Sequence, residues 1–294
     1  MTETTAPQSA GWRMKLAIFA LCAAIFAVLW FMVAALGTKF GLWPWQVGLG
    51  QMTIGLGPMI AVSAFGISLI AQILSLIKAP RTQPFIIALG ATLLAAMCMF
   101  RLVGMCAQAT SLPPIHDIQT DWAMPISFSE TLMTARQSDG QTNPVLDAPT
   151  IPEGAENDWP GMGGRLVSEV QEEAEAQGEE DETVYPPLQP LYFDQAPTEL
   201  AAAIEKLMSR SGWSIVTSAP SENVETAQLE ATATSGWFGF KDDVAVRLTS
   251  VEGATRVDMR STSRVGLSDL GANSKRVHAF MSELQDRADG RLAP

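Results

Sequence analysis

The chain has 294 residues, 47% of them hydrophobic, and its mean hydropathy of +0.15 is high for a soluble protein. The net charge of −12 is unevenly placed, because residues 139–182 hold thirteen Asp or Glu against one Arg and so carry all of it. The remaining acidic and basic residues are equal in number, so the net charge of the chain says nothing about its folded parts. It also gives no indication of nucleic-acid binding.

Three apolar segments occupy the N-terminal third of the chain. They are residues 16–36, 54–77 and 84–103. Each is long enough to cross a bilayer of about 30 Å as a helix. Trp12, Trp43 and Trp45 flank these segments as interfacial anchors do. We therefore expect residues 1–110 to form a membrane anchor of three transmembrane helices, with the lipid bilayer as its partner.

Positively charged residues predict the orientation of this anchor. Four lie on the N-terminal side of the bilayer and two on the other: Arg13, Lys15, Lys78 and Arg81 against Lys39 and Arg101. Because cytoplasmic loops are enriched in Lys and Arg, we expect a multi-pass protein of the bacterial inner membrane with its C-terminal domain in the periplasm. No ionisable residue lies near the middle of a span, which argues against a transporter.

Composition divides the remainder of the chain into three parts. Residues 111–137 leave the membrane and are expected to begin an α+β domain. Residues 138–190 are rich in Pro, Gly and Glu and poor in apolar residues, so they are predicted to be an acidic, largely disordered linker or insertion. Within it, a short helix over residues 167–177 fits the pattern. Residues 191–288 complete the α+β domain.

Alternating side chains in the last part predict an antiparallel sheet. Residues 228–234, 244–248 and 255–261 each place apolar side chains on one face and polar side chains on the other. Glu252 and Gly253 suit the hairpin turn between the second and third of these strands.

Two helices and a further strand complete the predicted domain. Residues 197–212 carry apolar residues at helical spacing, residues 213–217 read as a strand, and a last helix is expected to begin with Ser268 as its cap. The predicted fold is thus a two-layer sandwich of an antiparallel sheet and two helices, with the polar face of the sheet open.

Three sequence blocks resemble a known family. They are PPIHDIQTD (residues 113–121), WFGFKDDVAVRL (237–248) and TRVDMRSTSRVGLSDLGANSKRVHAF (255–280). They are similar to the signature blocks of domain of unknown function family 1499, whose uncharacterised members come from bacteria and plastids and often carry preceding membrane spans. The resemblance covers about residues 111–286, with residues 151–183 looking like an insertion. It implies an α+β domain and no known activity.

The polar face of the predicted sheet is one candidate site. Arg247, Arg256, Arg260 and Arg264 share it with Glu230 and Asp258. One interpretation is a solvated face with cross-strand ion pairs of little energetic weight. The other is an anion-binding face, because guanidinium forks match carboxylate and phosphate geometry. For Arg264 we expect a structural clasp between the last strand and the final helix.

A second candidate site lies before the acidic segment. His116, Asp117 and Asp121, with Asp242 and Asp243, would make an acid–base or hard-metal site. The alternative is that these carboxylates cap turns and pair with the arginines. The sequence has no zinc-binding Cys/His pattern, nucleophile elbow, phosphate loop or dinucleotide fingerprint, so neither a metal nor a cofactor is predicted.

These patterns favour a membrane-anchored envelope protein over an enzyme. We expect a periplasmic binding or scaffolding module whose partner is an envelope protein or an anionic ligand. The alternative is a periplasmic hydrolase that uses the His116, Asp117 and Asp121 cluster, with or without a metal.

Overall fold

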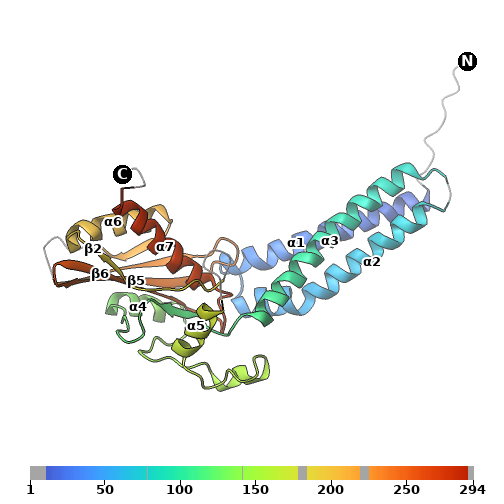
Figure 1. The fold of residues 1–294 in the computed structure, drawn as a ribbon. Helices are drawn as coiled ribbons and strands as arrows, with labels where there is room; N and C mark the ends of the chain where they lie inside the picture. The colour runs from blue at the N-terminus through green and yellow to red at the C-terminus, as the bar shows by residue number, and fades with distance from the viewer. Residues whose placement is uncertain (1–10, 78, 141, 178–183, 219–224, 291–294) are drawn as a thin grey trace, which may run out of the picture. The chain divides into compact units, whose positions relative to one another are not determined.

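The computed structural model describes residues 11–77, 79–140, 142–177, 184–218 and 225–290. Its elements form two compact units, drawn as a ribbon in Figure 1. The first unit contains the described residues up to Ala107 and is assigned the loop residues Gly236–Gly239. The second contains the described residues of Gln108–Ser235 and those from Phe240 onward.

Among the residues that the structure describes, three helical segments are long and apolar enough to cross a membrane. They are α1 (Trp12–Lys39), η1 continued by α2 (Gln46–Leu56 and Gly57–Ser75), and α3 (Thr82–Ser111). Alanines dominate their buried positions, among them Ala20 of α1, Ala64 of α2 and Ala91 of α3. Small side chains let helix backbones approach closely. The prediction of three long apolar helices is confirmed.

The second of these segments starts at Gln46, earlier than the predicted start at residue 54, because η1 is a π-helix that continues into α2. A π-helix has i→i+5 backbone hydrogen bonds in place of the i→i+4 bonds of an α-helix. Trp30 Nε1 of α1 donates to the Met52 carbonyl at 2.9 Å, and Thr53 Oγ1 donates to the Gly48 carbonyl at 2.8 Å. These two side chains therefore add hydrogen bonds to carbonyls of the π-helix.

The second unit is built around a six-stranded antiparallel sheet. Its order is β1–β6–β5–β4–β3, and β2 pairs with the opposite end of β6 from β1. The strands are β1 (Asp117–Gln119), β2 (Leu191–Phe193), β3 (Ser214–Thr217), β4 (Thr226–Thr234), β5 (Lys241–Val251) and β6 (Ala254–Ser263). The predicted turn joins β5 to β6, with φ of 43° at Glu252 and 85° at Gly253, as a two-residue hairpin turn requires.

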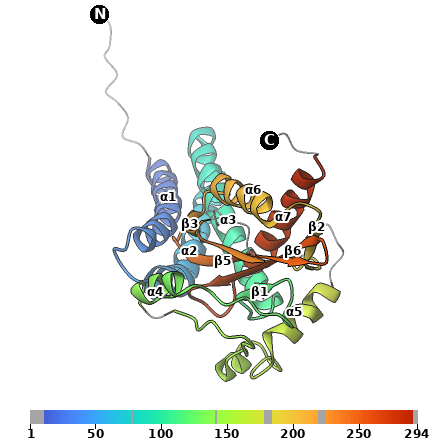
Figure 2. The same ribbon diagram turned by 90° about the vertical axis from the view of Figure 1, so that its left-hand side faces the viewer.

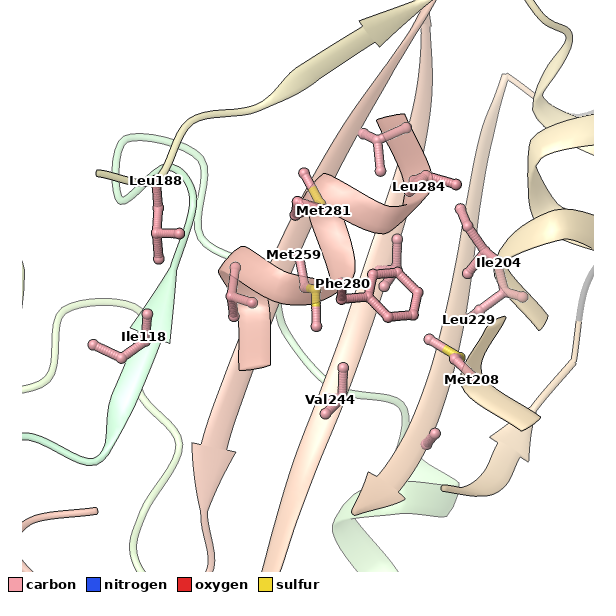
Figure 3. Packing of buried hydrophobic residues seen from close by; sticks show 14 of the residues in the cluster. Ile118, Leu188, Ile204, Met208, Leu229, Val244, Met259, Phe280, Met281 and Leu284 are labelled. Atoms are coloured by element: carbon pink, nitrogen blue, oxygen red, sulfur yellow. The ribbon is translucent and has the colours of Figure 1, made fainter. Parts of the chain in front are cut away.

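One face of the sheet is apolar and is covered by α6 (Pro197–Arg210) and α7 (Ala272–Ala288). Figure 3 shows their side chains meeting those of the sheet: Ile204 and Met208 from α6, Phe280, Met281 and Leu284 from α7, and Leu229, Val244 and Met259 from the strands. Trp213 stacks on Phe280 with ring centroids 5.2 Å apart. The predicted alternation of faces is confirmed by this core.

The other face of the sheet is also covered, which corrects the predicted two-layer arrangement. In Figures 1 and 2, α6 and α7 lie on one side of the sheet and α4 (Glu130–Ser138) on the other. Arg260 on this face is 0% exposed and Arg264 is 4% exposed. The face that we expected to be open is therefore buried, and the fold has three layers over this part of the sheet.

The predicted disordered linker is wrong for the described residues between 138 and 190. They form η2 (Glu153–Asn157) and α5 (Val167–Ala176), and Thr150 and Leu166 form an isolated β-bridge. Six of the described apolar residues of the segment are buried in the main core: Ile151, Ala155, Val167, Val170, Tyr185 and Leu188. The short predicted helix is α5. Residues 141 and 178–183 of the same prediction lie outside the described part.

Because this segment is packed in the core, shortening one of its buried side chains should destabilise the second unit. Ile151 is 1% exposed, so Ile151→Ala should lower the free energy of unfolding by about 2–5 kcal/mol through lost burial and a cavity. Chemical unfolding of the full-length chain in mild detergent would measure it. Glu172→Ala, at an exposed position of α5, is the control and should leave stability near that of the parent. Equal stability for both variants would restore the disordered-linker interpretation.

Candidate functional site

Eight charged residues lie together on the covered face of the sheet, and we call them the ionic layer. They are Asp117, Glu230, Asp243, Arg247, Arg256, Asp258, Arg260 and Arg264. Alternation along the strands places them on the face opposite the apolar core. The layer contains equal numbers of carboxylates and guanidiniums, so burying it does not require a net charge.

A cover segment, residues 120–140 and 142–147, closes over the ionic layer. Its helix α4 begins at Ser129, whose side chain accepts a hydrogen bond from Leu132 N at 3.2 Å. Such a cap is favoured at a helix start. Few of its side chains are apolar and buried, Ile126 and Leu132 among them. The segment is therefore held largely by polar contacts with the layer beneath.

Asp243 of β5 is the centre of the first part of the layer. Its Oδ2 accepts hydrogen bonds from Arg136 Nη1 of α4 at 2.6 Å and from Arg264 Nε at 2.8 Å. Its Oδ1 accepts from Arg264 Nη2 and Thr232 Oγ1, each at 2.7 Å. Arg264 also pairs with Asp139, next to the end of α4. Burial lowers the pKa of Arg136, and the bond to Asp243 opposes that change.

Arg264 was expected to join the last strand to the final helix, and the structure gives it other partners. The side chain is a structural clasp, but it ties the end of β6 to β4, β5 and α4, and no hydrogen bond joins it to the described residues of α7. Hydrogen bonds to Asp243 and Asp139 outweigh the effect of burial and raise the pKa of Arg264. It is a buried, fully paired cation.

Asp117 and Arg260 form the second part of the layer. Arg260 donates from Nε and Nη2 to the two carboxylate oxygens of Asp117, at 2.9 and 2.6 Å. The same guanidinium donates to two carbonyls of the cover segment, Ile126 at 2.7 Å and Leu146 at 2.7 Å. It also lies 5.5 Å from the ring centroid of Trp122, a cation–π distance. Arg260 thus joins β1, β6 and the cover segment.

Asp258 is the centre of the third part. It accepts two bonds from Arg256, at 3.0 and 2.9 Å, and pairs with Arg247 at 3.3 Å. Arg256 reaches on to Asp121 in the cover segment, and Arg247 donates to the Met124 carbonyl at 2.7 Å. These hydrogen bonds raise the pKa of Arg256, Asp258 being the largest cause.

Glu230 of β4 is a buried carboxylate that is held by hydrogen-bond donors of the helix start. Its two oxygens accept from the backbone N and the hydroxyl of Ser129, the N-cap of α4, the former at 2.6 Å. Gln228 Nε2 and Thr217 Oγ1 donate to it at 2.8 and 3.2 Å. A helix N-terminus favours a negative charge, so Glu230 fixes where α4 begins.

A sequence model described as "Protein of unknown function (DUF1499)" matches residues 117–284. The chain belongs to this family. No curated protein and no solved structure matches it significantly. The DUF1499 match begins at Asp117 itself and contains the whole ionic layer and cover segment, so the predicted resemblance is confirmed.

The predicted acid–base cluster of this DUF1499 protein is not brought together. Asp117 is engaged by Arg260 and Asp121 by Arg256. His116 is half-buried, and its Nδ1 lies 3.3 Å from the Leu267 carbonyl. Burial lowers the pKa of His116 and favours the neutral ring. Among the residues that the structure describes, no group of three or more His, Cys, Asp or Glu is placed to hold a metal ion.

The neighbouring aspartates Asp242 and Asp243 point to opposite faces of the sheet. Asp243 belongs to the ionic layer, whereas Asp242 pairs with Arg276 of α7 at 2.6 Å. Beside that pair, Asn273 Nδ2 of α7 donates to the His116 carbonyl at 2.9 Å and to Ser263 Oγ at 2.9 Å. These contacts form a small polar cluster at the edge of the apolar core.

Sequence reasoning missed three residues of the site and one at its edge. Arg136, Asp139 and Asn143 come from the cover segment and bind the layer, and Gln171 of α5 binds β1. Gln171 exchanges two hydrogen bonds with the backbone of Gln119, at 3.4 and 2.9 Å, and so completes the outer edge of the sheet as a further strand would. The Ser129-Glu130 start of a helix was the available signal for α4.

The loop before α7 differs from its prediction and carries a testable pH dependence. Ser268 is not the cap: α7 begins after Gly271, which has φ of 79°. Asp269 instead accepts hydrogen bonds from the backbone N of Gly271 and of Asn273, at 2.8 and 2.7 Å. Burial raises the pKa of Asp269 from 3.8 to about 6, despite these bonds.

The raised pKa of Asp269 sets the sign of the effect. The folded state binds this proton more tightly than the unfolded state, so the free energy of unfolding should fall as pH rises from about 4 to about 6. The contribution of this one group is at most about 3 kcal/mol. Asp269→Asn should remove it, which urea unfolding of both proteins at several pH values would measure. An unchanged pH slope in the variant would contradict the assignment.

Proposed function

We propose that this DUF1499 protein is a membrane-anchored envelope protein whose α+β unit serves binding or scaffolding. The observation that carries the proposal is the ionic layer. Its carboxylates and guanidiniums, which include most of the candidate site residues, are engaged with one another and with the cover segment. A general base or nucleophile must be able to reach substrate, and these groups are already committed to holding the fold.

The three long apolar helices support the membrane part of the proposal. The balance of positive residues supports an orientation with the N-terminus in the cytoplasm and the α+β unit in the periplasm of a bacterial inner membrane. Of the two partner classes, an envelope protein is favoured over an anionic ligand at the arginines. An anion would have to displace the carboxylates that hold Arg260 and Arg264.

The hydrolase alternative has less support. It needs His116, Asp117 and Asp121 to act on one substrate, yet each has a different partner on a different element. Hydrolase assays of the purified full-length chain, with and without a chelator, distinguish the two functions. We expect no turnover in either condition, and chelator-sensitive turnover would revive the hydrolase.

The topology is tested with C-terminal fusions to the full-length chain. Alkaline phosphatase folds outside the cytoplasm and green fluorescent protein inside it, so the first fusion should be active and the second dark. The reverse pair of results would place the α+β unit in the cytoplasm. Crosslinking in native membranes would then identify the partner, and an absence of specific protein adducts would contradict the scaffolding role.

A further inference from the structure

The loop between β4 and β5 presents an aromatic side chain to the exterior. Residues 236–240 read Gly-Trp-Phe-Gly-Phe, and Trp237 is 62% exposed. The loop is closed at its base: Ser235 N donates to the Phe240 carbonyl at 2.8 Å, and Phe240 N donates to Ser235 Oγ at 2.9 Å. The base of the loop is therefore fixed at the end of the hairpin.

Strand pairing places this loop at one particular end of the sheet. Thr234 pairs with Lys241 beside the loop, and Asp242 pairs with Ser263 at the end of β6. Thr262 in turn pairs with Asp117, the first residue of β1. Adjacent strands are about 4.8 Å apart, so the loop lies roughly 10–15 Å along the sheet edge from the start of β1.

The start of β1 is also where the chain arrives from α3. Only residues 112–116 separate Ser111, the end of α3, from Asp117, which limits the separation of the two to about 20 Å. Hydrogen bonds within the second unit hold this connection: Ser268 Oγ donates to the Pro113 carbonyl at 3.2 Å, and Ser263 N to the His116 carbonyl at 2.9 Å. The end of the sheet that carries Trp237 is thus the end tied to the last apolar helix.

We propose that residues 236–240 form a lipid-binding loop, with Trp237 inserted in the head-group layer of the bilayer that the apolar helices span. Trp combines a large apolar ring with one N–H donor and is enriched at membrane interfaces for that reason. Leu267, in the loop after β6 at the same end of the sheet, is a further exposed apolar side chain. The inference rests on the membrane anchoring proposed above.

The test uses the full-length chain in lipid nanodiscs with a fluorescent label at a single cysteine. Cys22, Cys98 and Cys106 are first replaced by Ala. The reporting label is placed by Gly236→Cys, where an added Cβ meets no atom within 4 Å. The control label is placed by Ser250→Cys, an exposed position at the opposite end of β5. Quenching by nitroxide lipids should be several-fold stronger for the label at residue 236.

Two aromatic substitutions then separate insertion from proximity. Trp237→Ser should remove most of the lipid quenching at residue 236. Tyr192→Ser removes an equally prominent aromatic ring, 57% exposed, from β2 at the far end of the sheet, and should leave the quenching unchanged. Equal effects of the two substitutions would overturn the assignment to Trp237.

The remaining outcomes distinguish this inference from the membrane anchor itself. Protein that enters nanodiscs but shows equal lipid quenching at residues 236 and 250 overturns the lipid-binding loop and leaves the anchor standing. A label at residue 236 that is shielded from aqueous iodide without being quenched by nitroxide lipids means that protein covers the loop, which also overturns it. Failure to enter nanodiscs overturns the membrane anchor instead.

Discussion

Replacing Asp243 by alanine is expected to lower the free energy of unfolding of the second unit by about 3–5 kcal/mol. The change removes the shared partner of Arg136 and Arg264, which are 1% and 4% exposed. A buried ion pair adds little net stability, but removing one partner leaves an uncompensated buried charge. Here one substitution removes the carboxylate that both guanidiniums share, so we expect one of the largest losses of stability among single substitutions in the chain.

Asp121→Ala is the matched control for Asp243→Ala. Asp121 also pairs with an arginine of the sheet, but 25% of its side chain is exposed, so water can replace the partner and the cost should be at most about 1 kcal/mol. Both variants would be unfolded by urea as full-length proteins in mild detergent. Similar small losses would mean that the ionic layer is hydrated and that the polar face of the sheet is open.

The strands of the sheet could be predicted from the sequence because the alternation that marks a strand is visible within a few consecutive residues. Val257 and Met259 alternate with Asp258 and Arg260, and side chains of successive strand residues must point to opposite faces. Whether a polar face is open is not a local property. It depends on a segment more than a hundred residues earlier in the chain, whose Arg136 belongs to a short helix of ordinary composition.

The disorder prediction failed for a related reason. Low average hydrophobicity argues that a segment cannot offset its conformational entropy, but an average ignores where the apolar residues fall. Ile151 and Val170 are buried, while Glu172 and Glu173, which follow Val170 in the same helix, face outward. Sparse apolar residues suffice when each reaches an existing core, and that core is supplied by the sheet and not by the segment.

The second large effect is expected at the Asp117–Arg260 pair. Arg260→Met or Asp117→Leu alone should each cost about 3–5 kcal/mol, because Asp117 is 1% and Arg260 0% exposed and either would be left as a buried, unpaired charge. The double variant Asp117→Leu/Arg260→Met leaves no charge behind. Its loss should be smaller than the sum of the single losses by about 2–3 kcal/mol, the coupling expected of neighbours.

Full recovery is not expected in the double variant, because Arg260 also serves the cover segment. The carbonyls of Ile126 and Leu146 each lose a donor that lies 2.7 Å away, and a buried unsatisfied carbonyl costs about 1–3 kcal/mol. The control is a double-mutant cycle on Glu283 and Arg287, an i,i+4 pair on α7. The coupling free energy of that pair should be only about 0.3–0.5 kcal/mol. Additive losses at Asp117 and Arg260 would mean that the two charges are separately solvated. A residual loss in the double variant, together with faster proteolysis of residues 120–147, would identify Arg260 as the residue that holds the cover segment on the sheet.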